Sequence, residues 1–267
     1  MKHILLPTDF SKNALKACEY AIALFKKEAS TFYVLHADPS ATSTGRGASL
    51  NKELAKTVAH LKNISTGSEH HFETKLLLKD LFAGVERFII EKDIDFIVMG
   101  TKGSSALKEL FMGSKAVKML ESIRICPILM VPDTYQHVPI ERFMIATNFD
   151  HYYERVELNP VIRLAKNSGV EIQVVHVIDG APLSDYQEKL KALLKKKMKG
   201  INFSFEEVSQ TESLANTITE LVAERNVHLL AMIYHRYGFF KELFATGVIK
   251  KLAFNTSVPF LVLPEVE

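Results

Sequence analysis

The chain of 267 residues repeats itself once, and this repeat limits the folds open to it more than any other feature. Four segments of the first half recur in the same order in the second half. They are HILLPTDF at 3–10 with RFMIATNF at 142–149, YVLHA at 33–37 with VVHV at 174–177, KELF at 108–111 with KELF at 241–244, and CPILMVP at 126–132 with VPFLVLP at 258–264. Two copies of one domain of ordinary size are the simplest account. We therefore predict domains at 1–132 and 140–267, joined by a linker at 133–139 with a proline at each side.

Each half alternates short apolar runs with longer segments of helical pattern. In the first half the runs VLHA, FIVMG and ILMV are apolar on both faces, as in strands of a parallel sheet that helices cover on both sides. Leu15, Cys18, Ile22 and Phe25 follow helical spacing. Strands are predicted at 2–8, 31–37, 71–78, 94–100 and 127–131, and helices near 11–28, 50–65, 81–92 and 113–122. The alternation predicts two similar three-layer, doubly wound α/β domains.

The composition indicates which cellular location and which partners to expect for the chain. Cys18 and Cys126 are the only cysteines, too few for a disulfide framework, which favours a reducing, cytoplasmic location. No apolar run approaches the roughly 20 residues of a membrane span, and the start MKHILLPTDF lacks the features of a signal peptide. A formal net charge of +2 is too small an excess of positive charge to indicate nucleic-acid binding. We therefore expect neither a membrane nor a nucleic-acid partner.

The segment VMGTKGSSALKELFMGSK at 98–115 places glycines after a buried strand. Gly100 and Gly103 allow backbone N–H groups to approach an anion closely, and Gly113-Ser114 stands where a new helix would begin. The unpaired N–H groups at such a helix start suit a phosphate. The spacing matches neither GxGxxG nor GxxxxGK[ST], which argues against a dinucleotide Rossmann site and a P-loop. The segment therefore indicates a phosphate cradle, and the alternative is a strand–helix loop without a ligand.

Asp9 follows the first predicted strand, as His36-Ala37 and Gly100 follow the second and the fourth. In parallel α/β sheets ligands bind beyond the carboxyl ends of the strands, where the strand order switches. If the first and fourth strands are neighbours, Asp9 and the glycine segment face one crevice. The Asp9 carboxylate could then accept hydrogen bonds from a ribose hydroxyl or an adenine amine. The alternative is that Asp9 or Ser11 caps the following helix, and the two roles can coexist.

Three motifs together resemble the universal stress protein family: PTDFS at 7–11, LHA at 35–37, and MG-x2-G-x9-GS at 99–114. The resemblance extends over both halves, as in a tandem form of the family. It implies a five-stranded parallel sheet of the adenine-nucleotide-alpha-hydrolase-like type, with an adenine nucleotide bound at the strand ends. ATP is the implied ligand, with ADP or AMP as alternatives and Mg²⁺ as an optional companion.

The resemblance also implies which residues bind the nucleotide. Asp9 would contact the adenosine, with help from Pro7, Thr8 and the backbone of Ala37. The remaining positions would run from the ribose to the phosphates, in the order Met99, Gly100, Lys102, Gly103, Gly113, Ser114 and Lys115.

The second half departs from this pattern. Asn148 replaces the aspartate. Aligning the two KELF segments puts Ile233 and Arg236 in place of the first two glycines, and Thr246-Gly247 in place of the glycine and serine that begin the helix. The large side chains of 234–237 would crowd the pocket. We therefore expect one nucleotide site, in the first half, and a stabilising role for the second half, with an anion near Arg236 as the alternative.

Other features have simpler structural explanations. The basic stretch 189–199 is predicted to be an amphipathic outer helix with a solvated lysine face, and the alternative is a surface for an anionic membrane or nucleic acid. His36 and His176 recur at one place in each half, which favours a shared structural role. His70-His71 lacks the further ligands of a metal site. No pairing of a nucleophile with a base is evident, so no catalytic residue is predicted, and slow hydrolysis of ATP stays open.

Three functions follow from these patterns: an ATP-binding regulatory protein of stress responses with an unidentified protein partner, a slow ATPase, and a nucleotide-free interaction scaffold. The apolar final strands at 127–131 and 259–263 would each lie at a sheet edge. We expect them to pair antiparallel, giving an internal pseudo-dimer that is a monomer or a homodimer in solution.

Overall fold

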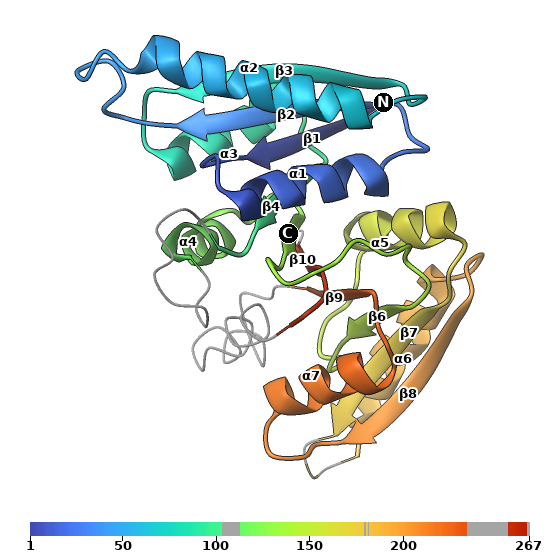
Figure 1. The fold of residues 1–267 in the computed structure, drawn as a ribbon. Helices are drawn as coiled ribbons and strands as arrows, with labels where there is room; N and C mark the ends of the chain where they lie inside the picture. Colours follow the sequence, from blue (N-terminus) through green and yellow to red (C-terminus); the bar gives the residue numbers. More distant parts are fainter. Residues whose placement is uncertain (103–112, 179, 181, 234–255, 266–267) are drawn as a thin grey trace. The chain divides into compact units, whose positions relative to one another are not determined.

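The structure is a computed structural model that describes residues 1–102, 113–178, 180, 182–233 and 256–265. The chain divides into two compact units, Met1–Thr134 and Tyr135–Glu267 (Figure 1). The division falls inside the segment 133–139.

The first unit has a parallel sheet of five strands in the order β3-β2-β1-β4-β5. The strands are β1 (Lys2–Pro7), β2 (Ser30–Ala37), β3 (His70–Leu77), β4 (Phe96–Gly100) and β5 (Ile128–Val131). β1 lies between β2 and β4, which confirms that the first and fourth strands are neighbours. The strand order therefore switches at β1 and β4, and the carboxyl ends of these strands meet at one edge of the sheet.

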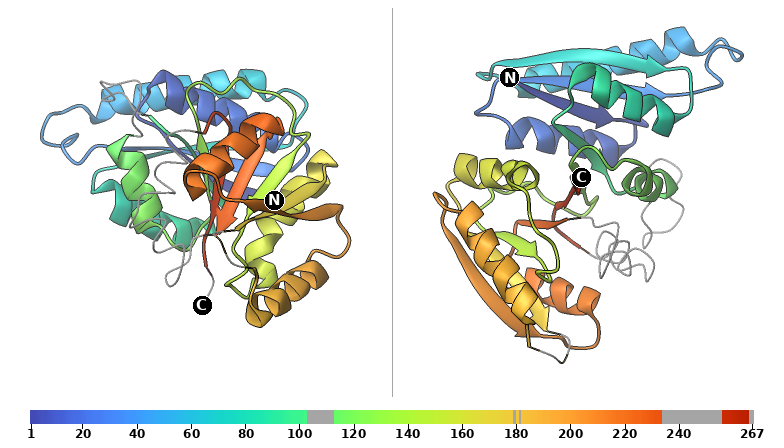
Figure 2. Two further views of the ribbon diagram at one scale, coloured as in Figure 1. Left: turned by 90° about the horizontal axis from the view of Figure 1, so that it is seen from below. Right: turned by 180° about the vertical axis from the view of Figure 1, so that it is seen from behind.

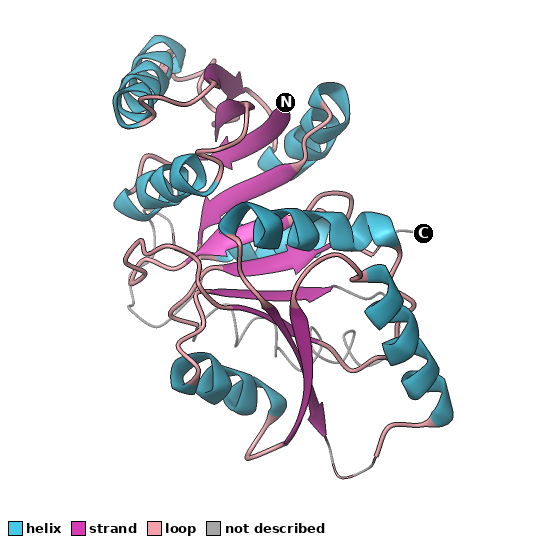
Figure 3. Cartoon of the chain, turned by 90° about the vertical axis from the view of Figure 1, so that its right-hand side faces the viewer, coloured by secondary structure: helices cyan, strands magenta, loops and turns pink. Residues whose placement is uncertain are grey.

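Helices cover both faces of this sheet, which makes three layers (Figures 2 and 3). The helices are α1 (Lys12–Leu24), α2 (Gly47–Ile64), α3 (Leu81–Lys92) and α4 (Ser114–Ser122). α1 packs on β4 and β5, and α2 packs on β2 and β3. Phe32 and Tyr33 are successive residues of β2 and so face opposite sides of the sheet. The Tyr33 ring meets Phe88 of α3, with ring centroids 5.4 Å apart, so α3 covers one of these sides.

The second unit repeats this arrangement, with parallel strands in the order β8-β7-β6-β9-β10. Its strands are β6 (Phe143–Ala146), β7 (Ile172–Ile178), β8 (Phe203–Ser209), β9 (Leu229–Ile233) and β10 (Phe260–Leu263), and its described helices are α5 (Arg155–Ser168), α6 (Asp185–Lys197) and α7 (Leu214–Glu224). The register puts Ile4 beside Phe96 in the first unit and Phe143 beside Leu229 in the second. Equivalent residues of the repeat therefore pair in both sheets, and the predicted α/β fold is confirmed.

The basic stretch 189–199 forms most of α6 and the residues that follow it. Leu190, Leu194 and Met198 are buried, while Lys189 and Lys195 are exposed. The prediction of an amphipathic outer helix is therefore confirmed. Of the helices in the described ranges, none combines the length and the apolarity needed to cross a membrane.

Candidate functional site

The chain turns sharply after β1, at Thr8–Ser11. Phe10 has a φ of 63°, in the left-handed region that residues other than glycine rarely occupy. Thr8 Oγ1 accepts a hydrogen bond from Phe10 N at 3.0 Å, and Asp9 Oδ1 accepts one from Ser11 N at 3.1 Å. Ser11 Oγ accepts from Ala14 N at 3.2 Å and is the N-cap of α1. The capping role therefore belongs to Ser11, and Asp9 lies half-buried beside the strand switch.

His36, near the end of β2, holds this turn to the sheet. Its Nδ1 donates to the carbonyl oxygen of Thr8 at 2.8 Å. Its ring also packs against Phe10, with ring centroids 4.5 Å apart. The imidazole thus supports the left-handed turn from the neighbouring strand.

The second unit has the same left-handed turn after β6, and a histidine holds it in the same way. Phe149 has a φ of 56°, and its N donates to Thr147 Oγ1 at 3.1 Å. His176 Nδ1 donates to the carbonyl oxygen of Thr147 at 3.0 Å. The shared structural role predicted for His36 and His176 is confirmed.

Gly100 ends β4 at a point where α1 comes very close to the sheet. A Cβ atom at position 100 would lie 2.3 Å from Asn13 Oδ1 and 3.0 Å from the Asn13 carbonyl oxygen, so its presence would force a shift. Two hydrogen bonds hold Asn13 there: its Nδ2 donates to Val131 O at 3.2 Å, and its Oδ1 accepts from Lys102 N at 2.8 Å. The packing of α1 therefore requires glycine at this position. Sequence reasoning missed Asn13, because its partners are 118 and 89 residues away along the chain.

Lys102, two residues beyond β4, forms an ion pair. Its Nζ donates to Asp133 Oδ2 at 2.8 Å, and the two side chains are 19% and 38% exposed. Lys16 of α1 also donates to the carbonyl oxygen of Asp133, at 2.5 Å. A phosphate bound at the end of β4 would compete with the Asp133 carboxylate for the Lys102 ammonium.

The glycine segment leaves β4 at Thr101 and returns to it at Gly113. Gly113 N donates to Thr101 O at 2.8 Å. Gly113 is the N-cap of α4, with φ −61° and ψ 143°, and no side chain caps this helix. Ser114 and Lys115 are exposed. An uncapped helix start offers N–H groups and a partial positive charge to an anion.

The structure brings most of the predicted site residues to one edge of the first sheet. They are Pro7, Thr8 and Asp9 after β1, Ala37 at the end of β2, Met99, Gly100 and Lys102 at the end of β4, and Gly113, Ser114 and Lys115 at the start of α4. The predicted residue Gly103 lies outside the described residues.

The described histidine and cysteine side chains away from this edge of the sheet, such as His70 and Cys18, have structural roles. No cluster of three or more histidine, cysteine or acidic residues that could hold a metal ion occurs there. His70 lies between Ser65 Oγ at 2.6 Å and the carbonyl oxygen of Phe25 at 3.1 Å. Burial raises the pKa of the Cys18 thiol to about 12, so this thiol is not a nucleophile at neutral pH.

Comparison with known proteins bears on the first unit most directly. A model of the universal stress protein family matches residues 1–132. A universal stress protein of Methanocaldococcus jannaschii is 30% identical over 139 residues, which cover 49% of this chain and 81% of that protein. This chain belongs to the universal stress protein family.

Two solved structures resemble this universal stress protein over both of its units. A universal stress protein from Archaeoglobus fulgidus has a TM-score of 0.71 at 19% identity and covers 99% of this chain and 97% of its own. A functionally unknown protein from Pseudomonas aeruginosa has a TM-score of 0.62 at 13% identity and covers 99% and 92%. At these identities the likeness shows the fold alone.

Proposed function

We propose that the first unit binds ATP or another adenine nucleotide at the carboxyl ends of β1 and β4, and that the protein acts as a nucleotide-dependent regulator in stress responses. The observation that carries the proposal is the return of the glycine segment to β4. Because Gly113 N donates to Thr101 O at 2.8 Å, the start of α4 is fixed next to the strand switch. Membership of the universal stress protein family supports the same site.

The phosphates would bind at the start of α4. The backbone N–H groups of the first turn and the Ser114 hydroxyl are donors, and the helix dipole adds a partial positive charge. No side chain caps this helix, so a cap does not compete with the phosphates. The exposed Lys115 adds a positive charge to the same region, and Lys102 would add another once a phosphate displaces the Asp133 carboxylate from it.

The adenosine would bind at the ends of β1 and β2. Asp9 presents a carboxylate, whose two oxygens can accept about four hydrogen bonds between them, at least one of which goes to Ser11 N. Ribose hydroxyls are suitable donors to a carboxylate in this position. Ala37 and the largely buried Met99 border the same edge and suit the apolar face of a base.

We propose this nucleotide site for the first unit alone. In the second unit Asn148 takes the place of Asp9, and its amide is paired with Asp150. Asn148 Nδ2 donates to Asp150 Oδ2 at 2.7 Å, and Asn148 Oδ1 accepts from Asp150 N at 3.2 Å. The Asp150 carboxylate would repel a phosphate. The residues aligned with the remaining glycines, Arg236 and Thr246-Gly247, lie outside the described residues.

Isothermal titration calorimetry on the full chain tests the proposal with ATP, ADP and AMP. We expect one nucleotide per chain. Folded protein that gives no heat with any of the three at millimolar concentration would contradict nucleotide binding. Two equal sites per chain would contradict its restriction to the first unit. Chromatography of the recovered nucleotide measures slow hydrolysis separately.

Gly113→Val is expected to weaken ATP binding at least about thirtyfold, because the side chain covers N–H groups that would each donate to a charged phosphate. The φ and ψ of Gly113 are −61° and 143°, values that valine adopts without strain. Loss of stability should therefore stay near 1 kcal/mol, the usual cost of a poor N-cap. Calorimetry and thermal unfolding on the same samples separate the two effects.

Lys118→Ala is the matched control, since Lys118 is an exposed residue of the same helix. Its affinity for ATP should stay within about twofold of the parent chain. If Gly113→Val binds ATP as tightly as Lys118→Ala, the start of α4 is not the phosphate site.

Asp133→Asn is expected to strengthen ATP binding about two- to fivefold, because it removes a carboxylate that holds Lys102 and repels phosphate. Adenosine lacks phosphates, so its affinity should not change. Titration of both ligands at low and physiological salt measures the difference. Equal changes for ATP and adenosine would show that Asp133 acts on the fold and not on the phosphates.

A further inference from the structure

The first unit ends at a residue that two lysines hold in place. Asp133 follows β5 closely, and the first unit extends one residue further, to Thr134. Lys102 Nζ donates to Asp133 Oδ2 at 2.8 Å, and Lys16 Nζ donates to the carbonyl oxygen of Asp133 at 2.5 Å. Asp133 is therefore the point at which the segment 133–139, which joins the two units, is anchored to the first unit.

The backbone beside this anchor is bonded to the start of the glycine segment. Thr101 N donates to Val131 O at 3.1 Å, and Asn13 Nδ2 donates to the same oxygen at 3.2 Å. Asn13 Oδ1 in turn accepts from Lys102 N at 2.8 Å. The backbone of Lys102 is thus fixed to the end of β5 through Asn13, so the ammonium at the end of its side chain can change partner without a movement of the main chain.

A phosphate at the start of α4 would compete with Asp133 for the Lys102 ammonium. Gly113 N donates to Thr101 O at 2.8 Å, so this helix start lies beside the residue that precedes Lys102. An ammonium has three donors and could reach both anions. The phosphate and the Asp133 carboxylate would then lie side by side, however, and like charges at short range repel. A phosphate carries more charge than one carboxylate, so the partly exposed Asp133 is the anion that leaves.

The second unit has an acidic residue at the same place but holds it differently. Glu265 follows the repeated segment VPFLVLP as Asp133 follows CPILMVP. Glu265 Oε1 lies 3.7 Å from His151 Nδ1, and the other ring nitrogen of His151 lies 3.0 Å from the buried Glu157 carboxylate. His151 stands in the connection after β6, whereas Lys102 stands after β4. The partner of Glu265 is therefore not a residue expected at a phosphate site.

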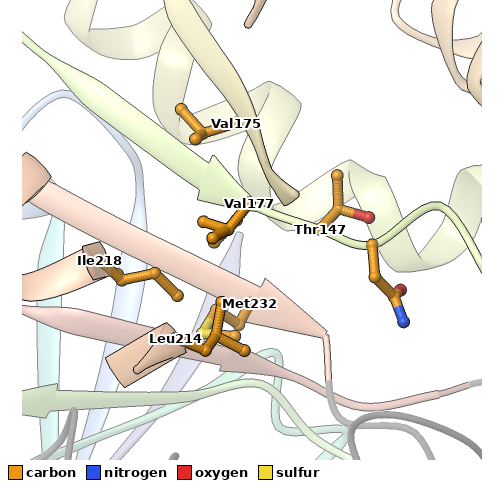
Figure 4. Close-up of a pocket in the computed structure, with 8 residues that line it drawn as sticks. Thr147, Val175, Val177, Leu214, Ile218 and Met232 are labelled. Atoms are coloured by element: carbon orange, nitrogen blue, oxygen red, sulfur yellow. The ribbon is translucent and has the colours of Figure 1, made fainter. Parts of the chain in front are cut away.

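The pocket at the strand ends of the second unit is too small for a nucleotide. Figure 4 shows Val177 of β7 facing Leu214 and Ile218 of α7 and Met232 of β9. The cavity that these side chains leave has a volume of about 10 Å³, which is room for about one water molecule. Of the two acidic anchors, Asp133 is thus the one whose cation a bound phosphate could take.

We propose that Asp133 is a phosphate-sensitive anchor: the phosphates of a bound nucleotide take Lys102 from Asp133 and release the start of the segment 133–139. This role of Asp133 rests on the nucleotide site proposed above, and it carries the occupancy of that site to the segment that joins the two units. Lys16 keeps its hydrogen bond to the Asp133 carbonyl oxygen, so the release loosens the segment without detaching β5. Adenosine, which lacks phosphates, should bind without this effect.

Backbone NMR relaxation of the full chain measures the release, because the order parameter of an N–H group reports its mobility. The order parameter of Thr134 should fall from about 0.85, the value of a rigid backbone, towards about 0.6 on saturation with ATP. With bound adenosine it should not change. The order parameter of Glu265 is the control within the same spectra and should respond to neither ligand. Calorimetry on the same samples shows whether each ligand binds.

Two substitutions break the ion pair from opposite sides. Asp133→Asn and Lys102→Gln should each lower the order parameter of Thr134 by a similar amount before any nucleotide is added, and ATP should then lower it no further. Glu265→Gln is the matched control at the equivalent position of the second unit. It should leave the order parameter of Thr134 unchanged and the affinity for ATP within about twofold of the parent chain.

The outcomes separate the anchor from the nucleotide site. Heat of ATP binding without a change at Thr134 would overturn the anchor and leave the nucleotide site standing, as would an equal fall with adenosine. A rigid Thr134 in both Asp133→Asn and Lys102→Gln would also overturn the anchor. The absence of heat with ATP, ADP and AMP would overturn the nucleotide site and the anchor with it.

Discussion

Gly100→Ala should destabilise the first unit by about 3 kcal/mol. The added methyl group would lie 2.3 Å from Asn13 Oδ1, so the Asn13 side chain must leave its place. Overpacking of this kind costs about 1–3 kcal/mol, and the lost hydrogen bonds to Val131 O and from Lys102 N add about 1 kcal/mol each at most. Urea unfolding followed by circular dichroism measures the loss, and hydrogen exchange of the α1 amides shows where it occurs.

Gly47→Ala is the control for this substitution. A Cβ atom at Gly47 would meet nothing within 4 Å, and Gly47 is the first residue of α2. Alanine there should be neutral or stabilising by up to about 1 kcal/mol. The double variant Asn13→Ala/Gly100→Ala should recover only part of the loss, because the carbonyl oxygen of residue 13 would still lie 3.0 Å from the new methyl group. A Gly100→Ala chain as stable as Gly47→Ala would show that α1 moves away at no cost.

Glu157→Ala should destabilise the second unit by a similar amount, about 3 kcal/mol. Glu157 is 2% exposed, and its carboxylate oxygens accept from His151 Nε2 at 3.0 and 3.1 Å. One of them also accepts from Glu154 N at 2.6 Å, which completes the start of α5. The substitution removes these three contacts and leaves two partly buried donors without this acceptor. Urea unfolding, with the second unit followed by hydrogen exchange, measures the effect.

Glu188→Ala is the matched control, a glutamate in the first turn of α6 whose side chain is 57% exposed. Its ion pair with Lys191, at 3.8 Å, is worth less than about 0.5 kcal/mol. Glu157→Gln keeps the shape and one acceptor oxygen, so we expect an intermediate loss. Equal stability of Glu157→Ala and Glu188→Ala would show that the buried carboxylate adds nothing to the fold.

The central strands β4 and β5 could be predicted because each is a continuous apolar run, FIVMG and ILMV, and the repeat of the sequence predicted the two similar units. β4 is predicted at 94–100 and observed at Phe96–Gly100, and α3 is predicted and observed at 81–92. The meeting of Asp9 and Gly100 at one edge of the sheet follows from the same pattern, since both stand at the ends of apolar runs whose strands are neighbours. The antiparallel pairing of 127–131 with 259–263 stays a prediction.

The partners of individual polar side chains could not be predicted, because they depend on contacts between distant parts of the chain. Both Asp9 and Ser11 are good capping residues, and only the backbone geometry assigns the cap to Ser11. The ion pair of Lys102 with Asp133 joins residues 31 positions apart. The buried contact between His151 and Glu157 has no pattern in the sequence that distinguishes it from a solvated pair.

The connection between the first strand and the first helix is longer in the second unit than in the first. This difference explains why the end of the fourth strand requires glycine in the first unit but accepts a larger side chain in the second. Residues 8–11 join β1 to α1, whereas residues 147–154 join β6 to α5. The longer connection starts α5 four residues later than the repeat alone would place it. Ile233 can therefore stand where the first unit requires Gly100, and it is buried there at 1% exposure.

The paired left-handed turns show how the two copies of a repeat can differ in charge at one position without differing in fold. Asp9 Oδ1 accepts from the backbone N two residues later at 3.1 Å, and Asn148 Oδ1 does the same at 3.2 Å. Aspartate and asparagine share this acceptor atom, so exchanging them preserves the turn while it deletes or restores a full negative charge. At position 148 the exchange would also cost stability, because Asn148 Nδ2 donates to Asp150 Oδ2 at 2.7 Å and an aspartate there would face that carboxylate. One oxygen at this position therefore holds the turn in both units, and the second polar atom of the side chain is the part that differs between them.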